Sequence, residues 1–187
     1  MSENSGAQAT NQSAQVVVRR AQARDAQAIA DIYAPFVTDN AVSFEYVLPN
    51  VETMAERIRA TNERWVWLVS EVDSVVVGYA YANPFRSREA YDWTVETSAY
   101  LAPAGRGLGV ATRLYTELFS QLIGLGFKQA IAAIALPNPA SLRFHERLGF
   151  VEVGVLKQVG YKFGQWHDVA YYQRALVEPG GDTTRWL

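Results

Sequence analysis

Three glycines, Gly105, Gly107 and Gly109, form a turn directly before the clearest helical pattern in the chain. Leucines recur at helical spacing behind the turn, so we expect an amphipathic helix that ends at Gly124 and Gly126. A glycine-rich turn at a helix start presents several backbone N–H groups at the positive end of the helix dipole. The turn is therefore suited to bind a phosphate or pyrophosphate, although the same glycines could serve only to make a tight strand-to-helix turn.

Two common phosphate-binding motifs do not fit this turn. A P-loop requires Gly-Lys-Ser/Thr at the start of the helix, and the turn contains no lysine. The dinucleotide fingerprint G-x-G-x-x-G/A would need glycine or alanine where Thr112 or Val110 stands. The turn therefore predicts a phosphate site of another kind.

Glu96 and His145 are the side chains best suited to move a proton. Glu96 lies within a predicted strand, on the same face as Thr94 and Ser98, where an ionised carboxylate is costly to bury unless it faces a cleft or a partner. It could act as a general base or form a structural ion pair with an arginine. His145 titrates near neutral pH and could transfer a proton, or it could be an ordinary histidine on the surface of a helix.

Arg86 and Arg88 lie in a polar loop that leads into the strand containing Glu96. Arginine can bind a carboxylate or a phosphinate through two hydrogen bonds at once, so this loop is a candidate for binding an acidic substrate group. Each arginine taken singly could equally be a solvated loop charge. Tyr91 and Trp93 could wall the same pocket, although most aromatic residues at such spacing belong to a core.

Predicted strands and helices follow one another along the chain and must position these residues. We expect strands at 16–20, 65–71, 75–82, 93–101, 130–136, 150–156 and 169–176. We expect a first helix that is capped by Asp25 and disturbed at Pro35, and a second helix that is capped by Asn50. A third helix should have an apolar face that runs from Leu108 to Leu125, and a fourth should span 139–148. This order predicts a mixed α/β domain with one open sheet.

Composition excludes several classes of function. The 187 residues are 49% hydrophobic and 19% charged, and their net charge of −2 is far from the basic character of a duplex-binding protein. The sequence contains no cysteine, so it can form neither disulfides nor a thiolate nucleophile. With only two histidines, a zinc site would need carboxylate ligands, and we expect no metal.

The chain divides into one folded domain and two tails. Residues 1–15 are polar and predict a disordered tail, residues 16–177 form the domain, and residues 178–187 read as a C-terminal tail. The amino terminus lacks the pattern of a secretory signal, and no apolar run approaches the ~20 residues of a membrane span. We therefore expect a cytoplasmic protein that binds neither nucleic acid nor a membrane.

Two motifs, in this order along the chain, resemble the GNAT N-acetyltransferase superfamily. R-x-x-G-x-A at Arg106, Gly109 and Ala111 resembles the pyrophosphate-binding Q/R-x-x-G-x-G/A motif of these enzymes. The segment NPASLRFHERLGF at 138–150 is similar to their later N-x-x-A/S-x-x-x-Y/H-E-x-x-G-F/Y segment. The resemblance narrows to the phosphinothricin and methionine sulfoximine acetyltransferase branch through AYDWTVE at 90–96, GFK at 126–128, LPN at 136–138 and KFGQWHDV at 162–169.

The resemblance implies a GNAT-like fold, an open and mostly antiparallel sheet with splayed parallel strands flanked by helices. It implies acetyl-coenzyme A as the acetyl donor and a small amine, such as methionine sulfoximine or phosphinothricin, as the acceptor. The residues implied to bind the donor are Ala99, Tyr100, Leu101, Arg106, Gly107, Leu108, Gly109, Val110, Ala111, Thr112, Asn138 and Ser141. Those implied to bind the amine are Arg86, Arg88, Tyr91 and Trp93.

The resemblance also implies direct transfer, with Glu96 as the general base, and a homodimer, which is common among similar proteins. Most relatives outside the branch carry tyrosine where His145 stands, so the identity of a general acid is left open. Acetylation of a peptide or protein amino terminus is an alternative function, and a coenzyme A-binding sensor without chemistry is another. The presence of both Glu96 and His145 counts against the sensor.

Overall fold

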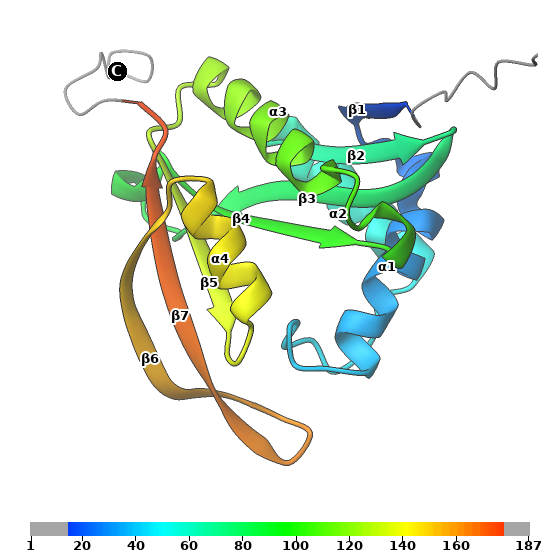
Figure 1. The fold of residues 1–187 in the computed structure, drawn as a ribbon. Helices are drawn as coiled ribbons and strands as arrows, with labels where there is room; N and C mark the ends of the chain where they lie inside the picture. The colour runs from blue at the N-terminus through cyan, green and yellow to red at the C-terminus, as the bar shows by residue number, and fades with distance from the viewer. Residues whose placement is uncertain (1–14, 178–187) are drawn as a thin grey trace, which may run out of the picture.

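The computed structural model describes residues 15–177 (Figure 1). The tail predicted at 1–15 therefore lies outside the described residues but for its last position, and the tail predicted at 178–187 lies outside them altogether. The elements, in chain order, are β1 (Val16–Arg20), η1 (Ala23–Asp25), α1 (Ala26–Thr38), α2 (Val51–Arg64), β2 (Trp67–Val72), β3 (Val75–Pro84), η2 (Glu89–Tyr91), β4 (Thr94–Leu101), η3 (Pro103–Gly105), α3 (Val110–Gly124), β5 (Gln129–Ala135), α4 (Pro139–Arg147), β6 (Val151–Lys162) and β7 (Gln165–Ala175).

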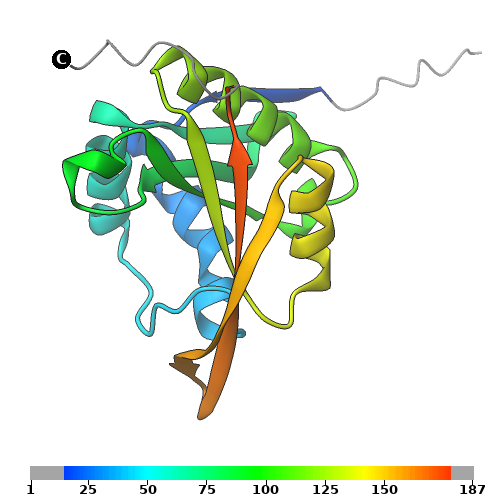
Figure 2. The ribbon, with the colours of Figure 1, turned by 90° about the vertical axis from the view of Figure 1, so that its left-hand side faces the viewer.

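The strands of the described range form one sheet in the order β1-β2-β3-β4-β5-β7-β6. Each neighbouring pair is antiparallel except β4 and β5, which run parallel at the centre of the sheet. The sheet is open, and helices cover both of its faces (Figures 1 and 2). The predicted fold class, an open and mostly antiparallel sheet with parallel central strands, is confirmed.

The first face of the sheet is covered by α3 and α4. Leu114, Leu118 and Leu122 of α3 recur at helical spacing and are fully buried against Leu68 of β2 and Val95 of β4. Burying one such side chain contributes about 1.5–3 kcal/mol. This core holds α3 across the sheet and fixes the position of the glycine-rich turn at its start.

The opposite face is covered by α1 and α2. Ile29 of α1 and Met54 and Ile58 of α2 pack against Trp67 and Tyr79 of the sheet. Successive residues of a strand point to opposite faces, so neighbouring residues of one strand belong to different cores. The same alternation places the even-numbered side chains of β4 on the α1–α2 face.

The start and the end of α1 differ from the prediction. Asp25 precedes α1 but does not cap it, because its carboxylate accepts hydrogen bonds from the Arg19 guanidinium at 2.7 and 2.8 Å and from the Gln22 N–H at 2.7 Å. Pro35 does not end the helix, which continues to Thr38. Proline there removes only one hydrogen bond close to the helix end. The predicted cap of α2 is confirmed, because Asn50 Oδ1 accepts from the Thr53 N–H at 2.8 Å.

The predicted apolar face of α3 begins too early. Leu108 is 44% exposed and precedes the helix, which starts at Val110. Gly107 and Gly109 have φ of +77° and +73°, in the left-handed region, so regular helix cannot begin until the glycines have been passed. Val110, not Leu108, is the first buried side chain of the helix.

The last two strands extend past their predicted limits and form a hairpin that reaches away from the helices (Figure 1). Strand β6 continues to Lys162, whereas the alternation in its sequence ended at Leu156. Residues 157–159 are exposed and the buried positions that follow are Gly160 and Lys162, which are not apolar side chains, so no hydrophobic period of two was visible there. Large exposed apolar side chains of the hairpin are Val151, Val153, Leu156, Val159, Tyr161, Phe163 and Trp166.

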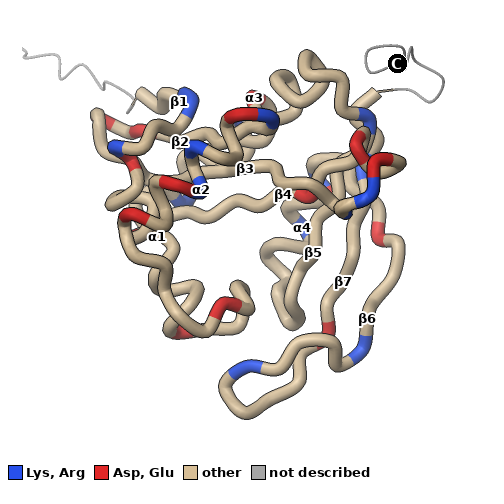
Figure 3. The backbone as a smooth tube through the Cα atoms, turned by 180° about the vertical axis from the view of Figure 1, so that it is seen from behind, with Lys and Arg blue, Asp and Glu red and all other residues tan. Residues whose placement is uncertain are grey.

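Charged residues are distributed over the whole molecule. Figure 3 shows Lys and Arg interspersed with Asp and Glu along the backbone of the described range. No helix within residues 15–177 is long and apolar enough to cross a membrane.

Candidate active site

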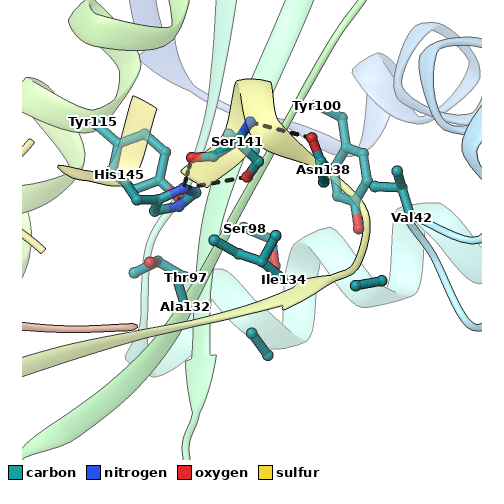
Figure 4. A pocket seen from close by; sticks show the side chains of 13 residues that line it. Val42, Thr97, Ser98, Tyr100, Tyr115, Ala132, Ile134, Asn138, Ser141 and His145 are labelled. Atoms are coloured by element: carbon teal, nitrogen blue, oxygen red, sulfur yellow. Dashed lines mark hydrogen bonds between the residues drawn. The ribbon is translucent and has the colours of Figure 1, made fainter. Parts of the chain in front are cut away.

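The two parallel strands at the centre of the sheet separate soon after they pair. Their ladder joins 94–96 of β4 to 129–131 of β5 and ends there. Beyond it, a narrow cavity of about 60 Å³ lies between 97–100 and 132–135 (Figure 4). A strand edge released from its neighbour offers backbone N–H and C=O groups to an extended ligand. The gap between β4 and β5 is therefore suited to an elongated molecule such as a pantetheine chain.

The start of α4 closes one side of this cavity. The Asn138 side chain caps the helix, because its Oδ1 accepts from the Ser141 N–H at 3.1 Å. Both residues line the cavity, as do Ala99 and Tyr100 of β4. Val42, from the segment between α1 and α2, lines it from the opposite side (Figure 4). Four of the residues predicted to bind the donor thus meet in one place.

The glycine-rich turn has the geometry of an anion site. Gly105 packs so closely on β3 that an added Cβ would lie 2.7 Å from the Val77 carbonyl oxygen. At Gly107 and Gly109, by contrast, an added Cβ would meet nothing within 4 Å, so the backbone is open to a ligand there. The first N–H groups of α3 have no intrahelical acceptor, and the helix dipole favours negative charge beside them. The predicted residues Arg106, Gly107, Leu108, Gly109, Val110, Ala111 and Thr112 lie together in this turn.

His145 is buried, not on the helix surface. Its side chain is 7% exposed at the base of the cavity (Figure 4). Nδ1 lies 2.9 Å from the Ser141 carbonyl oxygen, which can only accept, so this nitrogen carries the hydrogen. Nε2 then accepts from the Tyr115 hydroxyl at 3.1 Å. Burial lowers the pKa of His145, so the ring is neutral at neutral pH and is a hydrogen-bond acceptor at Nε2.

Glu96 lies at the point where the ladder between β4 and β5 ends. Its side chain is half-buried on the α1–α2 face, and burial raises the pKa of the carboxyl group while the charge of Arg86 lowers it in part. Glu96 forms no salt bridge within residues 15–177, so the structural ion pair considered from the sequence is not formed there. A carboxylate with a raised pKa at the edge of a gap fits a general base.

A second and larger cavity, of about 520 Å³, is lined by Ile131, the ladder partner of Glu96, although Glu96 itself lines neither cavity. Arg86 and Tyr91 from the β3–β4 link form one wall, and Thr94 and Ile131 form the floor. The opposite wall comes from β6 and β7. The cavity combines mostly apolar walls with one guanidinium, which suits a small ligand with one acidic group.

Three of the predicted site residues lie elsewhere. Arg88 is exposed at the start of η2 and lines neither cavity. Trp93 faces a separate hollow of about 140 Å³ next to α3, because its place before β4 directs it away from Arg86. Leu101 lies with Arg106 in a cavity of about 410 Å³ beside α1. The structure therefore separates Arg88 and Trp93 from Arg86 and Tyr91, with which the sequence had grouped them.

Comparison with known proteins decides the family. Residues 18–170 match the family described as an acetyltransferase (GNAT) domain. This chain belongs to the GNAT acetyltransferases. The resemblance inferred from the two motifs is confirmed, and with it the prediction that the chain is an enzyme acting on amino groups.

Three GNAT proteins are especially similar. The chain is 40% identical over 164 residues to phosphinothricin N-acetyltransferase of Streptomyces viridochromogenes, covering 88% of this chain and 90% of the relative. It is 33% identical to the L-methionine sulfoximine/L-methionine sulfone acetyltransferase of Salmonella typhimurium, covering 87% and 96%. A solved GNAT phosphinothricin acetyltransferase from Sinorhizobium meliloti, in complex with acetyl-CoA, matches with a TM-score of 0.84 and 36% identity, covering 92% of this chain and 97% of that one.

Tyr115 and Val42 line the narrow cavity but were not singled out from the sequence. Tyr115 lies in α3, 30 positions before His145, among apolar residues that indicate only core packing. Its hydroxyl among those residues was the available signal, because a buried tyrosine needs a partner. Val42 lies in an irregular segment that carries no periodic pattern, so nothing local could have placed it at the cavity.

Proposed function

We propose that this GNAT enzyme transfers the acetyl group of acetyl-CoA directly to the amino group of a small amino acid analogue such as phosphinothricin or methionine sulfoximine. The observation that carries the proposal is the position of Glu96, a half-buried carboxyl group of raised pKa at the end of the β4–β5 ladder, opposite Ile131 of the cavity that contains Arg86. The substrates named for the relatives carry an amine and an acidic group, which this pair of residues would match.

The donor would be held by two parts of the chain. The turn from Arg106 to Ala111 would bind the pyrophosphate through backbone N–H groups at the start of α3. The edge of β4 at Ala99 and Tyr100 would pair with the pantetheine arm, and Asn138 would contact it from α4. Acetyl-CoA supplies an activated thioester, and these contacts fix its carbonyl carbon beside Glu96.

Glu96 would start the reaction by taking a proton from the ammonium group of the acceptor, directly or through water. The neutral nitrogen then attacks the thioester carbonyl carbon, forming the C–N bond, and N–H groups around Ala99 to Leu101 stabilise the developing negative charge on oxygen. The C–S bond breaks, the sulfur leaves with the electron pair as a thiolate, and the second proton lost by the acetylated nitrogen passes to this thiolate, directly or through water. His145 would stay neutral, and because its Nε2 already accepts from the Tyr115 hydroxyl, it would act only through that hydroxyl.

Arg86 should contribute more to substrate affinity than Arg88. Both arginines are exposed, but Arg86 lines the larger cavity and Arg88 does not, so the two differ in position but not in side-chain chemistry. Arg86→Ala should lower kcat/KM for the amino acid about tenfold or more, since it leaves an acidic substrate group unpaired. Arg88→Ala, as the matched comparison, should have a smaller effect. Steady-state kinetics that gave Arg88→Ala the larger loss would contradict this placement.

The proposal includes a cytoplasmic homodimer. The β6–β7 hairpin exposes a row of large apolar side chains, an amount that monomeric proteins seldom leave in contact with water. Light scattering of the purified protein should give twice the mass of one chain. A monomer at micromolar concentration would contradict the homodimer and leave the enzymatic proposal untouched.

The alternative functions differ in which amine reacts. A thiol-release assay against free amino acids, polyamines and peptides should show release only with amino-acid-like acceptors. Faster release with peptide amino termini would support terminal acetylation, and coenzyme A binding with no release for any amine would support a sensor.

A further inference from the structure

Lys162 is a buried lysine without a carboxylate partner in direct contact. It lies near the outer end of β6 and is 2% exposed. Its Nζ donates to three backbone carbonyl oxygens, those of Val37 at 2.7 Å, Asn40 at 3.0 Å and Ser43 at 2.6 Å. An ammonium group has three protons, so these contacts use all of its donors. Lysine is rarely buried this deeply, and here three carbonyl dipoles take the place of an anion.

The three carbonyl groups belong to the end of α1 and the link that follows it. Val37 is in the last turn of α1, whose carbonyl groups lack intrahelical partners and favour a nearby cation. Asn40 and Ser43 lie in the irregular segment 39–50 that links α1 to α2, and both also contact α1 itself: the Ser43 N–H donates to the Phe36 carbonyl oxygen at 3.3 Å, and Asn40 Nδ2 donates to the Pro35 carbonyl oxygen at 3.0 Å. Lys162 adds a contact from the end of the sheet that spans seven residues of backbone, from 37 to 43.

Other contacts join the same two segments. The Phe44 ring lies against the backbone of Gly160, where an added Cβ would be 2.1 Å from the ring atom Cε2. The Tyr46 hydroxyl donates to the Tyr161 carbonyl oxygen. Figures 1 and 2 show the link between α1 and α2 approaching the hairpin from the helical side. Segments more than 100 residues apart in sequence are therefore tied together at this point.

The part of the link between the carbonyl groups of Asn40 and Ser43 lines the narrow cavity. Val42 follows Asn40 and precedes Ser43, and its side chain lines the narrow cavity together with Asn138 and His145 (Figure 4). A shift of the backbone at Asn40 or Ser43 would move Val42 directly, because Val42 is adjacent to Ser43 and only one residue separates it from Asn40. Lys162 of the hairpin therefore influences the position of Val42 in the wall of the cavity.

We propose that Lys162 is a positioning residue for acetyl transfer: by holding the carbonyl groups of Val37, Asn40 and Ser43, it fixes the wall of the narrow cavity that would hold the pantetheine arm of acetyl-CoA. The kinetic effect expected of Lys162 rests on the proposed function. The anchoring of the backbone by Lys162 does not depend on it. Lys162 touches no reacting atom and acts through Val42. Glu45, the nearby carboxylate, is paired instead with Arg57 at 2.7 Å.

The test is Lys162→Met, which keeps the length of the side chain and removes all three donors. The KM for acetyl-CoA should rise about tenfold, while the KM for the best amine acceptor changes less than twofold. Amide hydrogen exchange at 41–45 should become faster in the free protein. Lys157→Met is the matched control, because Lys157 is on the same strand but makes only an exposed pair with Asp168, and it should change neither quantity.

Two further variants keep the test decisive if Lys162→Met does not fold. Lys162→Arg retains the positive charge and several donors, so its KM for acetyl-CoA should lie between those of the parent protein and Lys162→Met. Tyr46→Phe removes only the exposed tie to the hairpin and should raise the acetyl-CoA KM by a smaller factor. Unchanged exchange at 41–45 in Lys162→Met would overturn the anchoring, whatever the enzyme acetylates. Faster exchange with an unchanged acetyl-CoA KM would overturn the positioning role, and failure of every amine to react would count against the proposed function alone.

Discussion

Glu96→Gln should lower kcat by about 10²- to 10⁴-fold near neutral pH, the usual cost of removing a general base. Glutamine has nearly the same shape and can occupy the same half-buried site, but it cannot take a proton from the attacking amine. The variant should therefore fold normally and bind acetyl-CoA as tightly as the parent protein does. Kinetics under saturating acetyl-CoA, with calorimetric titration of the donor, measure both quantities.

The pH dependence separates a catalytic Glu96 from a structural one. Because burial raises the pKa of Glu96 above its ordinary value of 4.5, the active carboxylate should be lost as pH falls through the raised pKa, and kcat/KM should fall with it. This acid limb should be absent from the residual activity of Glu96→Gln. Loss of folding rather than of rate in the variant would show that the carboxylate is needed for stability and not for proton transfer.

Gly109→Val should raise the KM for acetyl-CoA by about tenfold or more and leave the KM for the amine nearly unchanged. Gly109 has φ of +73°, which a β-branched residue adopts only at a cost of about 1–2 kcal/mol, and the open space beside it is where the pyrophosphate should lie. The valine would both strain the turn and occupy the space meant for the ligand. Gly109→Asn, which tolerates this backbone conformation better, should have an intermediate effect.

Gly164→Val is the matched control for backbone strain. Gly164 has φ of +72° and open space beside it, as Gly109 does, but it lies in the turn of the β6–β7 hairpin. It should cost similar stability without raising the KM for acetyl-CoA. Equal effects of both variants on the acetyl-CoA KM would mean that general strain, and not the phosphate turn, explains the loss.

Local patterns predicted most of the fold. Leu114, Leu118 and Leu122 recur at the helical period and lie in one core, and β2 and β3 form where strands were expected at 65–71 and 75–82. The outer part of β6 was not predicted, because residues 157–159 are exposed and the buried positions there are Gly160 and Lys162, which give no hydrophobic period of two. Patterns reveal an element only where its buried face carries apolar side chains.

The site was predicted in part, for the same physical reason. The phosphate turn and Asn138 belong to continuous motifs, so their spacing along the chain was enough to group them. Arg86 and Arg88 are two residues apart, and only the path of the β3–β4 link shows that Arg86 alone lines the larger cavity. Tyr115 and Lys162 act through contacts 30 and 119 to 125 residues away in sequence, which no local pattern contains.

The most direct test of the central claim is to identify the product that the purified protein forms from acetyl-CoA and a racemic mixture of phosphinothricin or methionine sulfoximine. Nuclear magnetic resonance should show the acetyl group on the α-nitrogen of one enantiomer, with one equivalent of free coenzyme A released for each acetylated molecule. Common amino acids should react more slowly under the same conditions, and amines without a carboxylate should not react. Acetyl-CoA consumption without an N-acetyl product, or faster acetylation of polyamines or peptides, would contradict the assignment of a small amino-acid-like acceptor.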